Sequence, residues 1–335
     1  PDLFGLSIIL SSFYYLIQQN SYFSKLIGGF LGGISTGIRL SYFPILIAPL
    51  LLLFKNKELD LKIFCSFTFG ILMWLIPVIY IEGFFSLYNS AYNHTIGHFF
   101  DFGGSIITET NIINRIKYLL WTIWSDGLGL FVNGRSYLTL LPIFPICYLL
   151  YNSLKTYKKG IENKNVKWII TAMIIYTLWI MLSQNLIYKS RHVLPLITFL
   201  IILIFSQKRS GMIMSMSFLY IITISIVSFN LVKDHKNGTA IFHLSNDINI
   251  KNADVVYSNP LINYYLRSQG YNAKLFNIEE YSDDDIKTIK SYDNIFVVGY
   301  YANLFENNFN YDLDTIYYHN PYMNRMWSEI PVFSL

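Results

Sequence analysis

Residues 27–54 read IGGFLGGISTGIRLSYFPILIAPLLLLF, an apolar stretch that a single cation, Arg39, divides in two. A charged side chain near hydrocarbon is costly, so it usually pairs, reaches the headgroups or marks a site. The glycines before Arg39 include Gly28-Gly29 and Gly32-Gly33, whose four-residue spacing lets membrane helices approach closely. The stretch therefore predicts two spans, 25–38 and 40–54, with a charged turn between them.

The composition extends this prediction to most of the chain. Of the 335 residues 53% are hydrophobic and only 14% are charged, whereas soluble domains carry about 25% charged residues. Apolar runs near the length of a membrane span recur through the first 232 residues. The candidate spans are 3–18, 25–38, 40–54, 62–82, 136–153, 167–186, 193–207 and 211–232. We expect a polytopic α-helical membrane protein with about eight spans, which begins at Pro1-Asp2 because its N-terminal part is missing.

The distribution of lysine and arginine predicts the topology. Three connections are basic, around Lys55, Lys155–Lys167 and Lys208-Arg209, and the positive-inside rule assigns all three to the cytoplasm. Arg39, the 83–135 stretch, the Tyr188–His192 loop and the C-terminal tail then fall on the extracytoplasmic side. The stretch 114–131 contains several charged residues and glycines, so we interpret it as a helix in the outer interface, with Trp121 and Trp124 at headgroup level.

Residues 233–335 follow a different pattern, that of a small extracytoplasmic α/β domain with a partly parallel sheet. Short apolar runs predict strands at 240–244, 254–258, 273–277 and 294–300. Helices are predicted at 260–269 and 282–291, the second opening on Ser282 with acidic residues in its first turn.

Several function classes have no support in the sequence. The net charge of +4 is modest, and no nucleic-acid partner is expected. Cys65 and Cys147 show neither zinc-ligand spacing nor a disulfide framework. His94, His98 and Asp101 could bind a divalent metal, but their spacing matches no metal motif, and a loop with aromatic anchors is the simpler interpretation. We therefore predict no metal ligand and no cofactor, leaving a divalent metal as an alternative.

Candidate site residues lie on the side predicted to be extracytoplasmic. Arg191 sits in the stretch Tyr188-Lys189-Ser190-Arg191-His192, between two apolar runs. Asp126 and Arg135 can face an outer cavity or simply pair with each other. Asp2 lies at the outer mouth of the first span, where it could act as a base or only end the helix.

Two segments resemble the GT-C superfamily of membrane glycosyltransferases, and in particular the protein O-mannosyltransferase and aminoarabinose-transferase group. Gly28 to Pro44 (GGFLGGISTGIRLSYFP) is similar to that group's glycine-rich helix ending in an arginine. Tyr188 to Leu196 (YKSRHVLPL) is similar to the motif that opens a late span. The order of spans, outer loops and a C-terminal domain also agrees with this group.

The resemblance implies transfer of a sugar from a polyprenyl-phosphate-linked donor to a glycan, lipid or protein acceptor, outside a bacterial inner membrane or its equivalent. Arg39, Lys189 and Arg191 would contact the donor phosphate, and His192, His98 and Arg135 would complete the binding site. The family's acidic catalytic residue would lie upstream of Pro1, which leaves Asp2, Asp101 and Asp126 as substitutes within the chain.

Three other functions remain open. A flippase or transporter of an anionic lipid would place Arg39 on a translocation path, although no inverted repeat is evident. A non-catalytic assembly protein would use the C-terminal tail to bind a partner. A glycan polymerase or ligase would share the donor chemistry of a glycosyltransferase.

Overall fold

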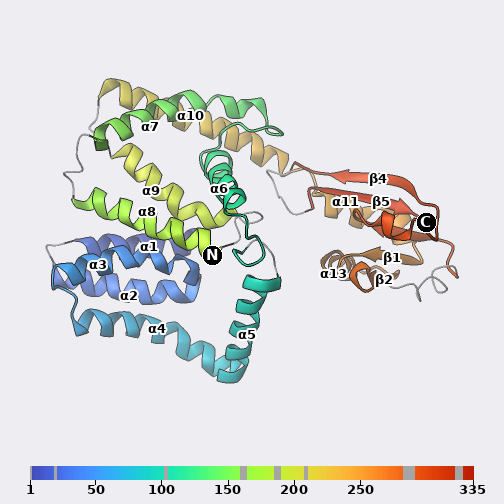
Figure 1. Ribbon diagram of the computed structural model, residues 1–335, viewed down its shortest axis with the longest axis horizontal. Helices are drawn as coiled ribbons and strands as arrows, with labels where there is room; N and C mark the ends of the chain where they lie inside the picture. Colours follow the sequence, from blue (N-terminus) through green and yellow to red (C-terminus); the bar gives the residue numbers. More distant parts are fainter. Residues whose placement is uncertain are drawn as a thin grey trace. The chain divides into compact units, whose positions relative to one another are not determined.

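The computed structural model (Figure 1) describes residues 2–18, 21–101, 105–158, 164–184, 190–206, 210–281, 291–320 and 327–335. The chain divides into two compact units, 1–226 and 227–335, and the division falls inside helix α10 (Gly211–Asp234). The first unit is helical and the second contains a sheet.

The helical unit consists of many segments of different length. In chain order they are α1 (Asp2–Ile17), α2 (Tyr22–Arg39), the 3-10 helix η1 (Leu40–Leu46), α3 (Ile47–Lys55), α4 (Leu61–Glu82), α5 (Phe84–Ile96), the π-helix η2 (Gly97–Asp101), α6 (Ile112–Trp121), the π-helix η3 (Thr122–Gly127), the 3-10 helix η4 (Tyr137–Leu140), α7 (Ile143–Lys158), α8 (Lys164–Ser183), the 3-10 helix η5 (Ser190–Val193), α9 (Leu194–Phe205) and α10.

Glycines on α2 produce its close packing against α1 and α4. A Cβ atom added at Gly33 would lie 2.1 Å from the carbonyl oxygen of Phe67 on α4, and one added at Gly28 would lie 2.8 Å from Leu16 on α1. Only glycine leaves room for such contacts, because any side chain would push the backbones apart. The prediction that these glycines let helices approach closely is therefore confirmed.

The chain turns back at Arg39, as the two predicted spans 25–38 and 40–54 require. Arg39 leaves helical geometry, with φ −154° and ψ 80°. A Cβ atom added at Gly32 would lie 2.9 Å from Leu46 Cδ1. Fourteen residues of straight helix would separate the two by about 21 Å, so the η1–α3 segment runs back beside α2.

Five helical segments within the described residues are long and apolar enough to cross a membrane, which indicates a membrane-embedded protein. They are Tyr22–Lys55, Leu61–Glu82, Tyr137–Tyr157, Lys164–Ser183 and Gly211–Lys233. Tyr22–Lys55 contains two of the predicted spans, and two more correspond to the shorter apolar helices Asp2–Ile17 and Arg191–Phe205. The number of eight spans and their orientation stay predictions.

The C-terminal unit holds a five-stranded sheet in the order β2-β1-β3-β5-β4. Its strands are β1 (Val255–Ser258), β2 (Lys274–Asn277), β3 (Ile295–Val298), β4 (Asp312–Tyr318) and β5 (Glu329–Ser334). β1 pairs in parallel with β2 and β3, whereas β5 pairs antiparallel with β3 and β4. The short helices of this unit are α11 (Ala240–Asn246), α12 (Ile248–Lys251), α13 (Pro260–Ser268) and the 3-10 helices η6 (Ile278–Glu280) and η7 (Ala302–Phe305).

Both faces of this sheet are covered, because β1 and β3 alternate their buried side chains. Val256 and Phe296 pack with residues of α11 and α13 on one face. Tyr257 and Val297 pack with Phe305 of η7 on the other. The partly parallel α/β domain, three of its predicted strands and the helix at 260–269 are thus confirmed.

The strand predicted at 240–244 is wrong, because these residues form helix α11. The side chain of Thr239 caps the helix by accepting a hydrogen bond from the Phe242 amide, and Ala240, Ile241 and Leu244 are buried on one helical face. A short apolar run does not distinguish a buried helix from a strand. The helix predicted at 282–291 lies almost entirely outside the described residues.

Candidate functional site

The site begins with the ion pair between Asp2 at the start of α1 and Arg39 at the end of α2. Gly5 makes this pair possible, since a Cβ atom there would lie 3.0 Å from the Cβ atom of Arg39. Both side chains keep about a quarter of their surface exposed, 28% for Asp2 and 24% for Arg39. The pair is therefore accessible from outside the helices.

Tyr42 of η1 forms the floor beneath the Arg39 guanidinium. The carbon at the centre of the guanidinium lies 6.0 Å from the centroid of the Tyr42 ring, which is within the range of a cation–π contact. Tyr42 is 1% exposed and meets Tyr176 of α8 edge to face, with 6.4 Å between ring centroids. Tyr176 in turn donates a 3.1 Å hydrogen bond to the carbonyl oxygen of His192.

This chain of contacts connects the two predicted cationic motifs. Arg191 is exposed on η5, next to the buried His192 whose carbonyl Tyr176 binds. Arg39 and Arg191 both act electrostatically on the Tyr42 hydroxyl. The structure therefore brings Arg39 and Arg191 to one neighbourhood, although 152 residues separate them in sequence. Lys189, from the same motif, lies outside the described residues.

Two polar atoms around this pair are buried without a hydrogen-bond partner among the residues that the structure describes. They are Arg39 Nε and Ser41 Oγ. A buried donor or acceptor that is left unsatisfied costs roughly 1–3 kcal/mol, so groups of them usually indicate a missing water or ligand. We refer to Asp2, Arg39, Ser41, Tyr42 and Arg191 as the arginine site.

Asp126 and Arg135 form hydrogen bonds within the segment 125–135 and not with the Asp2–Arg39 ion pair. Arg135 donates hydrogen bonds to the carbonyl oxygens of Ser125 and Leu130, the second at 3.3 Å. The hydroxyl of Ser125 donates to Asp126 Oδ1 at 3.2 Å. The π-helix η3, which carries Asp126, packs against η5, so Asp126 lies on an element adjacent to Arg191.

His98 binds the backbone at the end of α8. Its Nε2 atom lies 2.6 Å from the carbonyl oxygen of Ser183, and because a carbonyl only accepts, Nε2 is the donor. The substrate-binding role expected for His98 remains a prediction. The side chain of Asp101 is outside the described part of the chain. No cluster of three or more metal-ligating side chains occurs among the described residues.

Arg115 has a structural role that the sequence around it does not reveal. It is 1% exposed, and its guanidinium donates to the carbonyl oxygens of Ile180, Met181 and Gln184 at 3.3, 2.8 and 3.0 Å. Arg115 therefore caps the C-terminal end of α8, where the last carbonyls of a helix lack a following turn. The Ile180 carbonyl also accepts a hydrogen bond from the Gln184 amide. Burial lowers the pKa of this guanidinium.

An apolar cavity of about 430 Å³ lies along η3, α7 and α9. Its lining includes Trp121, Trp124, Leu128, Leu150 and Leu200. Trp124 is fixed by a 3.0 Å hydrogen bond from its ring nitrogen to the carbonyl oxygen of Phe131, and Trp121 is exposed. The helix predicted to lie in the outer interface is thus a real helix, α6, with Arg115 and Leu119 buried in the protein. Its position in a membrane interface stays a prediction.

No family model, no curated protein and no solved structure matches this chain.

Proposed function

We propose that this chain is a membrane glycosyltransferase that moves a sugar from a polyprenyl-phosphate-linked donor to an acceptor outside the cytoplasm. The observation that carries the proposal is the arginine site, where Arg39 and Arg191 share one neighbourhood with buried, unsatisfied polar atoms. A guanidinium binds phosphate through a planar fork of N–H donors. A site with two guanidiniums is suited to the phosphate that leaves the sugar.

The role of the two arginines would be electrostatic. Negative charge grows on the phosphate oxygens as the bond to the sugar breaks, and fixed cations stabilise that charge more in the transition state than in the ground state. Asp2 holds Arg39 in place through their ion pair. Of the three carboxylates predicted as substitutes for the base, Asp2 and Asp126 have described side chains, and the catalytic base stays unassigned.

The apolar cavity beside Trp121 and Trp124 supports a lipid-linked donor. A polyprenyl chain needs an apolar path next to the phosphate site, and this cavity is lined by η3, which packs against η5. In this proposal the arginine site and the C-terminal domain are extracytoplasmic, and the protein resides in a bacterial inner membrane or its equivalent. The acceptor would be a glycan, a lipid or a protein.

The test is transfer of sugar from a radiolabelled polyprenyl-phosphate donor in membranes that contain the natural protein. Arg39→Gln and Arg191→Gln are each expected to reduce transfer by roughly 100-fold, the loss typical of removing one group that stabilises a developing oxyanion. Unchanged transfer in both variants would refute the role of the arginine site. Movement of the lipid across the membrane without any covalent product would identify a flippase instead.

A further inference from the structure

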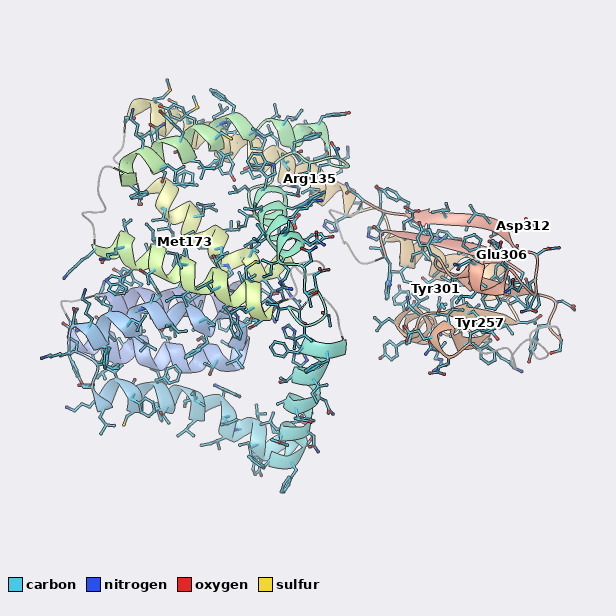
Figure 2. All side chains as sticks on the ribbon, in the orientation of Figure 1. Arg135, Met173, Tyr257, Tyr301, Glu306 and Asp312 are labelled. Atoms are coloured by element: carbon cyan, nitrogen blue, oxygen red, sulfur yellow. The ribbon has the colours of Figure 1, made fainter. Side chains whose placement is uncertain are left out.

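A second apolar cavity, of about 470 Å³, lies between α7, α8 and α9. Helices α7 and α8 both pack against α9, which lies between them (Figure 1). Leu200 and Leu203 of α9 form the floor of the cavity. The lining includes Leu150 and Leu154 of α7, Met173 and Ile174 of α8, and Leu200 and Leu203 of α9; Figure 2 labels Met173. The volume lies within the range of about 300–1,000 Å³ typical of ligand sites.

The walls of this cavity are open to the surroundings of the helices. Leu154 is 70% exposed and Ile174 is 56% exposed, whereas Leu203 on the floor is buried. Tyr157 closes one end, since its hydroxyl donates to the carbonyl oxygen of Leu203 at 2.9 Å. In a membrane-embedded protein an open apolar groove of this kind faces hydrocarbon, so its natural occupant is a lipid chain.

The end of the groove at Tyr157 carries positive charge. Lys155 follows Leu154 on α7, and Lys164 and Lys167 lie on α8. Lys167 precedes Ile170 by three residues and Ile174 by seven, the spacing of one helical face, so Lys164 and Lys167 continue the stripe of α8 that lines the groove. All three lysines are exposed. We call Lys155, Lys164 and Lys167 the lysine cluster.

Few acidic residues offset this cluster. The sequence from Lys155 to Lys167 contains five lysines against the single acid Glu162, a net charge of +4. Neither Lys155, Lys164 nor Lys167 forms an ion pair with another residue in the described part of the chain. Basic residues between helices at one end of a membrane domain attract anionic lipid headgroups.

We propose that this groove binds an anionic glycerophospholipid, with one acyl chain between α7 and α8 and the headgroup phosphate at the lysine cluster. The headgroup position is separate from the arginine site, although the groove shares Leu150 and Leu200 with the smaller cavity beside Trp121 and Trp124. Tyr176, which contacts Tyr42, follows Lys167 by nine residues, or about 14 Å along α8. The proposal goes beyond the glycosyltransferase proposal, because its headgroup lies at the lysine-bearing start of α8 and it concerns a different lipid.

Native mass spectrometry of the purified full chain tests this site. The protein in detergent is titrated with dioleoyl phosphatidylglycerol or with dioleoyl phosphatidylcholine, which share the same acyl chains. Phosphatidylglycerol is expected to bind at least about tenfold more tightly, since each nearby lysine adds to the attraction. Equal binding of the two lipids to the unmodified protein would overturn the proposal.

Two triple variants locate the headgroup. The variant Lys155→Gln, Lys164→Gln, Lys167→Gln is expected to bind both lipids equally. The variant Lys55→Gln, Lys57→Gln, Lys62→Gln removes the same charge from the connection between α3 and α4, and it should keep the preference. A preference that survives in the first triple variant, or that disappears equally in both, would overturn the proposal.

A further variant locates the acyl chain independently of charge. Thr177 lines the groove, so Thr177→Leu fills part of it and should weaken the binding of both lipids severalfold. Thr171 lies on the same helix but not in the lining, and Thr171→Leu is the matched control. Circular dichroism melting checks that each variant is folded. Unchanged binding of both lipids by folded Thr177→Leu would place the chain elsewhere and overturn the proposal.

Discussion

Arg115 and Arg39 are two arginines beside apolar helices, yet the structure uses them differently. Arg115 is 1% exposed and directs its guanidinium at three backbone carbonyls of α8. Arg39 is 24% exposed, pairs with Asp2, and leaves its buried Nε without a hydrogen-bond partner among the described residues. A guanidinium surrounded by carbonyls stabilises the fold, whereas one that is partly open retains donors for an anion. The position of an arginine near hydrocarbon therefore does not by itself reveal a binding site.

The largest effect is expected when Arg115 is replaced by methionine. Arg115→Met removes the donors from the last turn of α8 and leaves its carbonyls buried, which costs roughly 1–3 kcal/mol for each unsatisfied group. We expect a loss of about 3 kcal/mol or more in the free energy of unfolding, measured by denaturant titration in detergent.

Arg115→Lys is the control, because lysine keeps the charge but not the planar fork of donors. It should recover only part of the lost stability. A fully stable Arg115→Met protein would show that the carbonyls find other partners, and the contrast with Arg39 would fail.

Replacing Arg39 should produce the opposite profile. Arg39→Gln is expected to lower sugar transfer by roughly 100-fold, while the free energy of unfolding changes by less than about 1 kcal/mol because the ion pair with Asp2 is partly exposed. Transfer per folded protein and denaturant unfolding are measured on the same preparation.

Lys25 provides the matched control for Arg39. It also lies on α2 and forms an ion pair, with Glu58 at 2.9 Å, but at the other end of the helix. Lys25→Gln should leave transfer per folded protein unchanged. Equal losses of transfer in both variants would mean that any charge on α2 matters, not the arginine site.

The sequence predicted the surroundings of Arg39 better than those of Arg115. The signals around Arg39 lie close together in sequence, whereas the partners of Arg115 are distant in sequence. The glycine spacing, the cation and Pro44 lie within one stretch, so the turn at Arg39 and the close packing of α2 were predictable. Arg115 served only as an argument against a span, since its partners lie 65 to 69 residues away on α8. The periodicity of apolar residues along the sequence does not indicate that a side chain caps another helix.

The same limit explains what was missed in the C-terminal domain. The buried strands β1 and β3 read as continuous apolar runs and were predicted. Strand β4 lies at the edge of the sheet with Asp312 and Asp314 in it, and most of its side chains are exposed. Strand β5 contains Pro331. The charged residues of β4 are typical of a sheet edge. β5 lies inside the sheet, between β3 and β4, and its proline is unusual for an interior strand.

His98 tests the contrast with a smaller effect. If its bond to the carbonyl oxygen of Ser183 is its whole role, His98→Phe should cost about 1 kcal/mol in the free energy of unfolding and leave transfer unchanged. Thermal unfolding and transfer are measured together. A loss of transfer at unchanged stability would instead support the substrate-binding role predicted from the sequence, and would group His98 with Arg39 rather than with Arg115.

Asp60 extends the comparison to carboxylates, with the smallest expected effect. Unlike Asp2, Asp60 caps a helix: it accepts a 3.0 Å hydrogen bond from the amide of Ile63 and a second from the hydroxyl of Tyr22. The Tyr22 hydrogen bond, aided by the Ile63 amide, holds the pKa of the Asp60 carboxyl below its usual value. Its contribution to stability is therefore present above the unfolded pKa of about 3.9 and is lost as the pH falls through the lower folded value.

Asp60→Asn isolates this contribution, because asparagine also caps helices but does not titrate. The difference in melting temperature between the unmodified protein and Asp60→Asn should be constant near pH 6 and shrink below about pH 4. When Tyr22→Phe is added to both proteins, the difference in their melting temperatures should be smaller at every pH above that range. The reason is that Tyr22→Phe removes the main cause of the lowered pKa of Asp60. If the melting temperatures of the two proteins keep a constant difference down to about pH 3, the charge of Asp60 contributes nothing to stability. In that case a carboxylate at these helix ends would stabilise the fold through its charge only where it has a cationic partner such as Arg39.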